Sequence, residues 1–159
     1  VYALGTIQNA TNPQVVAKLL KAGAEDKDDL LRSNAVYSLA QLFRNKDVDF
    51  QQEISALIGR LESGVEPNNT DVAMFPRSTV RQSIAYALLQ AASNQHFTSG
   101  QIDHLLEMVS GDADRYVQGF IIEIARQSNN LSNGAVSTLL SALSRLRLSP
   151  RPLELKRAS

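Results

Sequence analysis

Cysteine is absent from this chain of 159 residues, and histidine occurs only twice. The lack of cysteine excludes disulfides, thiolate metal sites and cysteine nucleophiles, but it leaves the compartment open, with cytoplasm as the default. His96 is expected in a turn, and His104 on a helix close to Asp103 and Glu107. Such a pairing is common on helix surfaces, because a metal site needs further converging ligands. We therefore expect no metal and no cofactor.

Long apolar runs and catalytic motifs are missing as well. No stretch approaches the roughly 18 apolar residues of a membrane span, and no basic start followed by an apolar segment predicts a signal peptide. The sequence has no G-x-S-x-G nucleophile motif and no glycine-rich phosphate loop. We expect neither membrane insertion nor enzymatic activity. Because the chain begins at Val1, within a helical pattern, we also expect a fragment or a processed form.

Basic and acidic residues balance overall, at 16 each, but not along the chain. Residues 1–144 contain 11 lysines and arginines against 15 acidic residues, whereas residues 145–159 contain five against one. The mildly acidic body argues against nucleic acid as a partner, because phosphate backbones require a clustered positive field. With 43% hydrophobic and 20% charged residues, the composition is that of one globular domain.

A helical pattern at residues 29–43 recurs along the chain. Its apolar residues follow the period of an α-helix, with core positions at Leu31, Ala35, Leu39 and Leu42 and flanking positions at Val36 and Phe43. The layout repeats 49 residues later, with core positions at Val80, Ile84, Leu88 and Ala91. Tyr37, on the far side of the first copy, matches Tyr86, and Tyr2 lies 35 residues before Tyr37. Self-similarity at such periods is typical of a solenoid.

A second apolar spacing alternates with the first and predicts the partner helix of each pair. It occurs in four places: at Val16, Leu19 and Leu20; at Ile54, Leu57, Ile58 and Leu61; at Ile102, Leu105, Leu106 and Val109; and at Val136, Leu139, Leu140 and Leu143. We therefore predict an all-α chain, an α-solenoid of about four helix pairs of which the first and last are incomplete. The repeat domain spans residues 1–147 with an insertion loop at about 62–76, and a basic, flexible tail follows at 148–159.

The expected helix at 112–128 fits the pattern less well. Ile121 matches Leu88 at a shift of 33 residues, whereas Phe120 matches Tyr86 at a shift of 34. Since burial fixes the rotation of a helix, we favour the shift of 33 and interpret the aromatic match as a coincidence.

Paired helices of this length, with an aspartate before a helix that carries an arginine, resemble HEAT-like and armadillo-like repeats. The residues responsible are Asp29 with Arg32, Asp71 with Arg81, and Asp112 or Asp114 with Arg115. The gap between Asp and Arg varies, so a continuous ladder of such pairs is not implied. The resemblance implies that the arginine-bearing helices line the concave side of a solenoid. It also implies a chain that binds a protein or peptide and does not catalyse a reaction.

Three alternatives stay open. Residues 4–13 and 30–45 resemble the armadillo domains that act as nucleotide exchange factors for heat-shock chaperones. An enzyme-associated repeat resembling bilin lyase subunits would handle a pigment or present its substrate, although no Cys or His cluster supports it. Nucleic-acid processing, as in helical-repeat glycosylases, comes third because the body is acidic.

The candidate binding residues form a polar and aromatic strip on the arginine-bearing helices: Tyr2, Tyr37, Gln41, Arg44, Tyr86 and Gln90. In the predicted stack, Gln41 lies beside Gln90 and Arg44 beside Ser93. Tyr, Arg and amide side chains suit peptide recognition, because they offer contact area and hydrogen bonds at modest entropic cost. The other interpretation is that each tyrosine packs against the neighbouring repeat with its hydroxyl in water.

Overall fold

The computed structural model describes residues 12–63, 79–95, 97–109, 112, 114–128 and 131–147. Over these residues the chain forms seven helices and no strand, which confirms the all-α prediction. The helices are α2 (Pro13–Gly23), α3 (Asp29–Leu42), α4 (Gln51–Glu62), α5 (Val80–Ala92), α6 (Ser99–Val109), α7 (Arg115–Gln127) and α8 (Asn133–Arg147). None of these helices is long and apolar enough to cross a membrane. The expected insertion loop from residue 64 onward and the tail at 148–159 lie outside the described residues.

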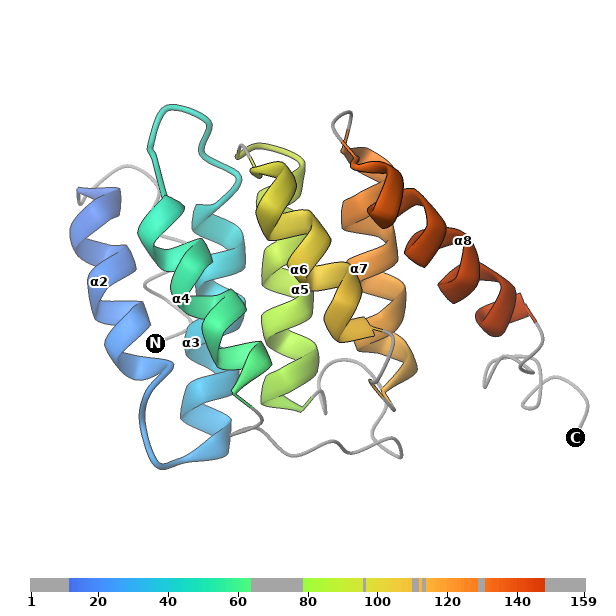
Figure 1. Cartoon of the computed structure of the whole chain (residues 1–159). Helices are drawn as coiled ribbons and strands as arrows, with labels where there is room; N and C mark the ends of the chain where they lie inside the picture. Colours follow the sequence, from blue (N-terminus) through green and yellow to red (C-terminus); the bar gives the residue numbers. More distant parts are fainter. Residues whose placement is uncertain are drawn as a thin grey trace, which may run out of the picture.

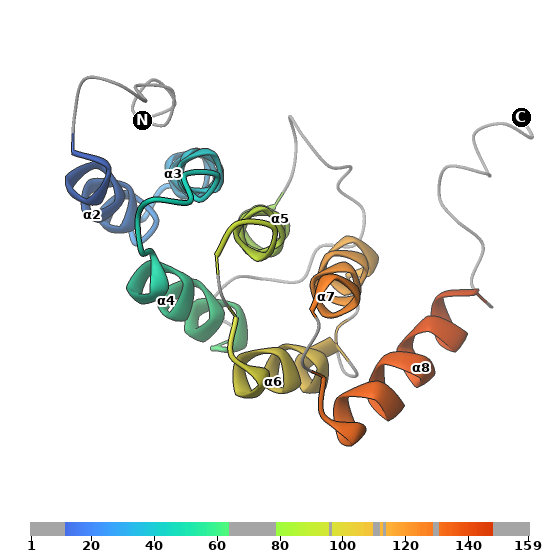
Figure 2. The ribbon, with the colours of Figure 1, turned by 90° about the horizontal axis from the view of Figure 1, so that it is seen from above.

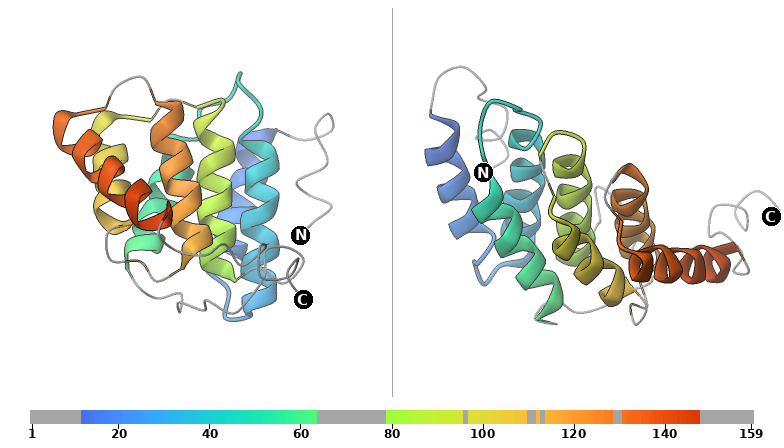
Figure 3. Two further views of the ribbon diagram at one scale, coloured as in Figure 1. Left: turned by 90° about the vertical axis from the view of Figure 1, so that its right-hand side faces the viewer. Right: turned by 45° about the horizontal axis from the view of Figure 1, so that its top comes forward.

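The helices lie in two rows (Figure 1). The inner row consists of α3, α5 and α7, which lie side by side (Figure 3), and the outer row consists of α2, α4, α6 and α8. Inner helices run in one direction and outer helices in the opposite one (Figure 1). The most extensive contacts join α3 to α5, α5 to α7, and α2 to α3, and α4 and α6 pack on α5 and α7. Seen from above, the rows curve with α3, α5 and α7 on the inner side (Figure 2).

Local sequence signals set the ends of α2. The side-chain oxygen of Asn12 accepts a hydrogen bond from Gln14 N at 3.0 Å, and Pro13 occupies the first helical position. The helix ends at Gly23. A Cβ on Gly23 would lie 3.1 Å from the Cβ of Ala35, so a glycine here permits the close approach of α2 to α3.

The turn between α2 and α3 is held by Arg32. Its Nη2 pairs with Oδ1 of Asp29 at 2.6 Å, which is the predicted pair. Its Nη1 donates to the carbonyl oxygens of Asp26 and Lys27 at 2.9 and 3.0 Å. The guanidinium therefore links two backbone carbonyls of the turn to the first turn of α3.

The hydrophobic core lies between the two rows. Most predicted core positions of the inner row are buried, at Ala35, Leu39, Leu42, Val80, Ile84, Leu88 and Ala91. Leu31 is half-buried. In the outer row, the predicted positions of α4 and α6 are buried at Ile54, Leu57, Ile58, Leu61, Ile102, Leu105 and Leu106. The helical period thus identifies the buried face wherever a helix has neighbours on both sides.

The two end helices of the outer row differ from the prediction. Leu19 in α2 is 57% exposed and Leu140 in α8 is 59% exposed, although the same spacing is buried in α4 and α6. Val136 and Leu143 are exposed as well. The reason is that α4 and α6 each lie between two outer helices, whereas α2 and α8 have a described outer neighbour on one side only (Figure 2).

Candidate functional site

The inner helices begin at fixed points because their first turns are capped. Asp28 caps α3 by accepting a hydrogen bond from Leu31 N at 2.9 Å. Thr79 and Gln82 form a reciprocal capping box at the start of α5. Asp114 caps α7 by accepting from two backbone N–H groups. These caps satisfy first-turn donors and define where each inner helix starts.

An aromatic row crosses the three inner helices. The rings of Tyr37 in α3 and Tyr86 in α5 stack with centroids 5.7 Å apart and an interplanar angle of 9°. Tyr86 also meets Phe120 of α7 edge-on, with centroids 5.9 Å apart and an interplanar angle of 66°. All three side chains are half-buried, so each ring keeps part of its surface in solvent. Tyr2, the predicted first member of the row, lies outside the described residues.

The aromatic match between Tyr86 and Phe120 is therefore structural, and its interpretation as a coincidence is wrong. The core register at a shift of 33 holds, because Val117, Ile121 and Ile124 are all buried. Phe120, next to the buried Ile121, nevertheless reaches Tyr86 at the edge of the buried face.

Polar side chains continue this surface at the C-terminal ends of the inner helices. Arg44 is exposed and donates through Nε and Nη2 to Oε1 of Gln90, at 3.2 and 3.1 Å. The hydroxyl of Ser93 donates to Oε1 of Gln127 at 3.2 Å, and Gln41 is half-buried on α3. Arg44 thus hydrogen-bonds to Gln90, which lies one turn before Ser93 on α5.

We call these residues together the inner surface: Tyr37, Gln41, Arg44, Tyr86, Gln90, Phe120 and Gln127. Phe120 and Gln127 are not among the predicted binding residues. Each lies 34 residues after an inner-row residue, Tyr86 and Ser93 respectively, so the sequence did contain a signal for both.

Glu123 lies one turn after Phe120 and accepts three hydrogen bonds. Arg126 donates from Nε at 2.7 Å and from Nη2 at 2.6 Å, and Gln127 donates at 2.9 Å. The hydrogen bonds from Arg126, followed by that from Gln127, lower the pKa of Glu123 to about 2. The same contact raises the pKa of Arg126. The ion pair of Glu123 with Arg126 therefore lies on α7 at the edge of the inner surface, next to Gln127.

We expect the Arg126→Ala variant to return the pKa of Glu123 toward its ordinary value of 4.5, because the strongest contact is lost. Gln127→Ala should raise that pKa less. Carboxyl carbon shifts followed by NMR across acidic pH measure both. Since the folded pKa lies below the unfolded one, the contact stabilises the fold above pH 4.5 and loses this effect as pH falls through about 2. An unchanged titration in Arg126→Ala would contradict the assignment.

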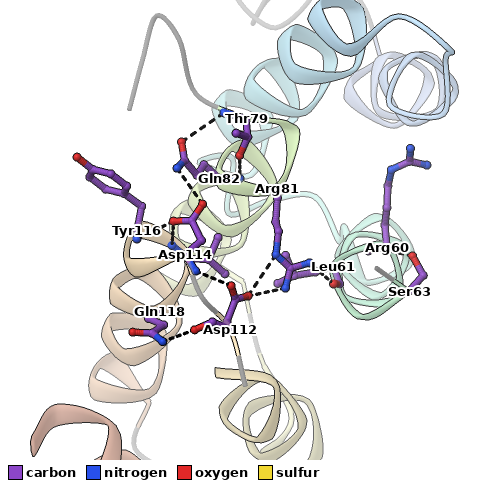
Figure 4. A network of polar contacts seen from close by, with 11 residues as sticks. Arg60, Leu61, Ser63, Thr79, Arg81, Gln82, Asp112, Asp114, Tyr116 and Gln118 are labelled. Atoms are coloured by element: carbon purple, nitrogen blue, oxygen red, sulfur yellow. Dashed lines mark hydrogen bonds and ion pairs between the residues drawn. The ribbon is translucent and has the colours of Figure 1, made fainter. Parts of the chain in front are cut away.

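A buried polar network lies where α5 and α7 begin (Figure 4). Arg81 donates from Nη1 to the carbonyl oxygen of Leu61 at 2.7 Å and from Nε to Oδ2 of Asp112 at 3.2 Å. Its Nη2 also pairs with Asp112, and the two side chains are only 9% and 1% exposed. This ion pair ties the end of α4 and the segment before α7 to α5.

The rest of the network consists of amides and carboxylates. Gln82 donates to Oδ2 of Asp114 at 2.9 Å, and Asp114 N donates to Oδ1 of Asp112 at 2.9 Å. Gln118 donates to the carbonyl oxygen of Asp112. Polar groups buried with their partners in this way fix the relative positions of helices.

The predicted aspartate and arginine pairs are therefore arranged differently along the chain. Asp112 pairs with Arg81, one inner helix back, whereas the prediction placed it or Asp114 with Arg115. Asp114 instead caps α7. Asp71, the predicted partner of Arg81, lies outside the described residues. Pairing between successive inner helices joins neighbouring helix pairs, and sequence spacing alone does not reveal it.

His104 lies between two outer helices. Its Nε2 is 3.1 Å from Oε2 of Glu62 on α4, and both side chains are partly exposed. Within the described ranges, no three His, Cys, Asp or Glu residues are grouped so that they could hold a metal ion. His104 therefore contacts a carboxylate of a neighbouring helix. The sequence had suggested Asp103 and Glu107, which lie on the same helix as His104.

The inner surface combines aromatic, amide and guanidinium groups. No family model, curated protein or solved structure matches the chain. What this surface can do is therefore inferred from its own chemistry. The ring faces offer apolar contact, while the amides and Arg44 offer hydrogen-bond donors and acceptors.

Proposed function

We propose that the chain is part of an α-solenoid of HEAT-like helix pairs that binds a protein or peptide on its inner surface and catalyses no reaction. Three features support this proposal: inner and outer helices alternate, α2–α3, α4–α5 and α6–α7 pack as pairs, and the rows curve around α3, α5 and α7 (Figure 2). Repeats that contact near neighbours and curve in this way create extended concave binding surfaces.

The aromatic row is the observation that carries the proposal. Tyr86 is held between Tyr37 and Phe120 by ring contacts, yet each ring is only half-buried. A ligand that covers the rings would gain contact area against side chains that are already ordered. Little conformational entropy is then lost on binding, which favours affinity.

The groups beside the rings fit a polypeptide ligand. Gln41 carries a donor and an acceptor, and Gln90 adds the amide N–H groups beside the oxygen that Arg44 contacts, so that together they can match N–H and C=O groups of an extended backbone. The guanidinium of Arg44 has further donors beyond the two that contact Gln90, and these suit a carboxylate or a carbonyl of the same ligand. A peptide running across α3, α5 and α7 would meet all of these groups in turn.

We expect the double variant Tyr37→Ala/Tyr86→Ala to bind peptide at least about tenfold more weakly, because aromatic anchors dominate such contacts. The probe is a peptide selected from a phage-displayed library on the unmodified chain, and its affinity is measured by fluorescence anisotropy. Gln52→Ala/Ser55→Ala, on the exposed side of α4, is the matched control and should bind normally.

A second pair of variants separates binding from packing. Because the two tyrosine rings stack, their removal also costs about 0.5–1.5 kcal/mol of ring–ring contact. Gln41→Ala and Gln90→Ala leave the ring contacts intact and should still weaken peptide binding. If selected peptides bound all three inner-surface variants as tightly as the unmodified chain, the proposal would be overturned and the rings would serve packing alone.

A further inference from the structure

The inner surface carries a single charged side chain, that of Arg44. Its two hydrogen bonds go to the neutral amide of Gln90, and among the described residues no carboxylate forms an ion pair with it. Glu123 and Arg126, at the edge of this surface, bond to each other, so their charges offset one another. The inner surface therefore has one positive charge that no neighbouring side chain neutralises.

The guanidinium of Arg44 is held in a defined position. Its Nε and Nη2, which share one edge of the planar group, both donate to Oε1 of Gln90, at 3.2 and 3.1 Å. The other edge, formed by the N–H groups of Nη1 and the second N–H of Nη2, points away from Gln90. Two N–H groups on one edge of a guanidinium match the two oxygens of a carboxylate. Arg44 can therefore bind a carboxylate and keep its contact with Gln90.

The hydrogen-bond acceptors around Arg44 are already engaged. Oε1 of Gln90 has two lone pairs, and the two bonds from Arg44 use them. The carbonyl oxygen of Leu42, at the end of α3, accepts from Asn45 N at 2.9 Å. The carbonyl oxygen of Asn45 accepts from Nε2 of Gln95 at 2.9 Å. A ligand at this end of the inner surface therefore meets mainly N–H donors.

N–H donors that carry a positive charge favour a carboxylate as the ligand group. An ionised carboxylate only accepts hydrogen bonds, and bonds between opposite charges are shorter and stronger than neutral ones. A backbone carbonyl would accept the same bonds but would leave the charge of Arg44 without a counterion. The aromatic row lies close by, because Tyr86 precedes Gln90 by four residues, about one helical turn. An apolar side chain next to the carboxylate would therefore reach the rings.

We propose that the peptide bound by the inner surface carries an aspartate or glutamate whose carboxylate pairs with Arg44, while a nearby apolar side chain of the same peptide covers the aromatic row. This inference rests on the proposed function, because it names the chemistry of the ligand of that same surface. The carboxylate belongs to a side chain and not to the end of the peptide. Arg44 reaches from α3 to Gln90 on α5, so a peptide that crosses all three inner helices continues past this contact.

Peptides selected from a phage-displayed library on the unmodified chain test this proposal. The tightest peptide is synthesised with an amidated C-terminus, and each of its acidic residues is replaced in turn by the corresponding amide, glutamine or asparagine. One of these replacements should weaken binding about five- to tenfold at low salt, as expected for a charge-assisted contact at a partly exposed site. The difference should shrink as salt is added, because salt screens exposed charges. Fluorescence anisotropy measures the affinities.

Arg44→Met tests whether the carboxylate binds at this residue. The variant lacks the charge, so it should bind the original peptide about five- to tenfold more weakly and should lose nothing further when the peptide carries the amide. Arg44→Glu should instead prefer a peptide with lysine at the acidic position. Lys18→Met removes one exposed positive charge from the outer helix α2 and is the matched control, which should bind normally. Circular dichroism verifies that each variant keeps its helix content, as expected for changes at exposed residues.

The results separate this inference from the proposed function. Selected peptides that contain no acidic residue, or whose amide replacements bind unchanged, overturn the inference and leave peptide binding in place. An amide replacement that weakens binding to the unmodified chain and to Arg44→Met equally also overturns it, because the carboxylate then binds elsewhere. If no peptide of the library binds the chain, the proposed function fails and the inference fails with it.

Discussion

The Asp112→Ala variant is expected to lose about 3–5 kcal/mol of unfolding free energy, because it leaves a buried guanidinium without its carboxylate. The carboxylate of Asp112 is 1% exposed, and Arg81 is 9% exposed. Water can therefore do little to replace the lost contact. Asp112 also accepts from Asp114 N, so its removal loosens the cap of α7. Urea unfolding followed by far-ultraviolet circular dichroism measures this loss of unfolding free energy.

Asp29→Ala is the matched control for this result. Asp29 also pairs with an arginine, but its side chain is 77% exposed, so its loss should cost at most about 1 kcal/mol. A second comparison replaces both members of the buried pair, as Arg81→Met with Asp112→Leu. Removing both charges should recover much of the stability lost in Asp112→Ala. Equal losses for Asp112→Ala and Asp29→Ala would show that the buried pair is not what joins the helices.

Leu88→Ala is expected to destabilise the chain by about 2–5 kcal/mol, because it opens a cavity in the middle of the array. Leu88 has no exposed surface and belongs to α5, which packs against α3, α4 and α7. Few residues can move to fill the space, since the neighbouring Ala87 and Ala91 are also fully buried. The same denaturant titration measures the change.

Leu30→Ala deletes the same atoms at a leucine that is 68% exposed. Its unfolding free energy should change by no more than about 0.5 kcal/mol. A Leu88→Ala variant as stable as Leu30→Ala would mean that α5 is not the centre of the core. A change in the denaturant slope, and not in the midpoint alone, would indicate that the end helices unfold separately from α5.

The helical period predicted the central helices well because their burial is set by local spacing. Ile84, Leu88 and Ala91 are buried where the pattern placed them, and Tyr37 and Tyr86 lie on the opposite, half-buried side. The same period failed for Leu19 and Leu140. A sequence pattern identifies the apolar face of a helix, but burial also requires a neighbour to cover that face.

Contacts between distant helices were harder to predict. The pair of Arg81 with Asp112 spans 31 residues, and nothing local to either residue distinguishes it from a pair with Arg115. The aromatic row was predicted in part, because Tyr37 and Tyr86 share a repeat position. Phe120 was missed because core spacing and aromatic spacing differ by one residue in α7, and only the packing shows that Phe120 contacts Tyr86.

The described helices contact mainly the helices next to them, and this has a mechanical consequence. Among the described helices, every extensive contact joins elements that are adjacent in the array, so a load applied at α2 and α8 must pass through each interface in series. Ring stacking and the bond from Arg44 to Gln90 lie on the inner side, where straightening the arc stretches them first. The curved array should therefore resist straightening elastically, and a molecule bound to the inner surface should change the force needed to straighten it.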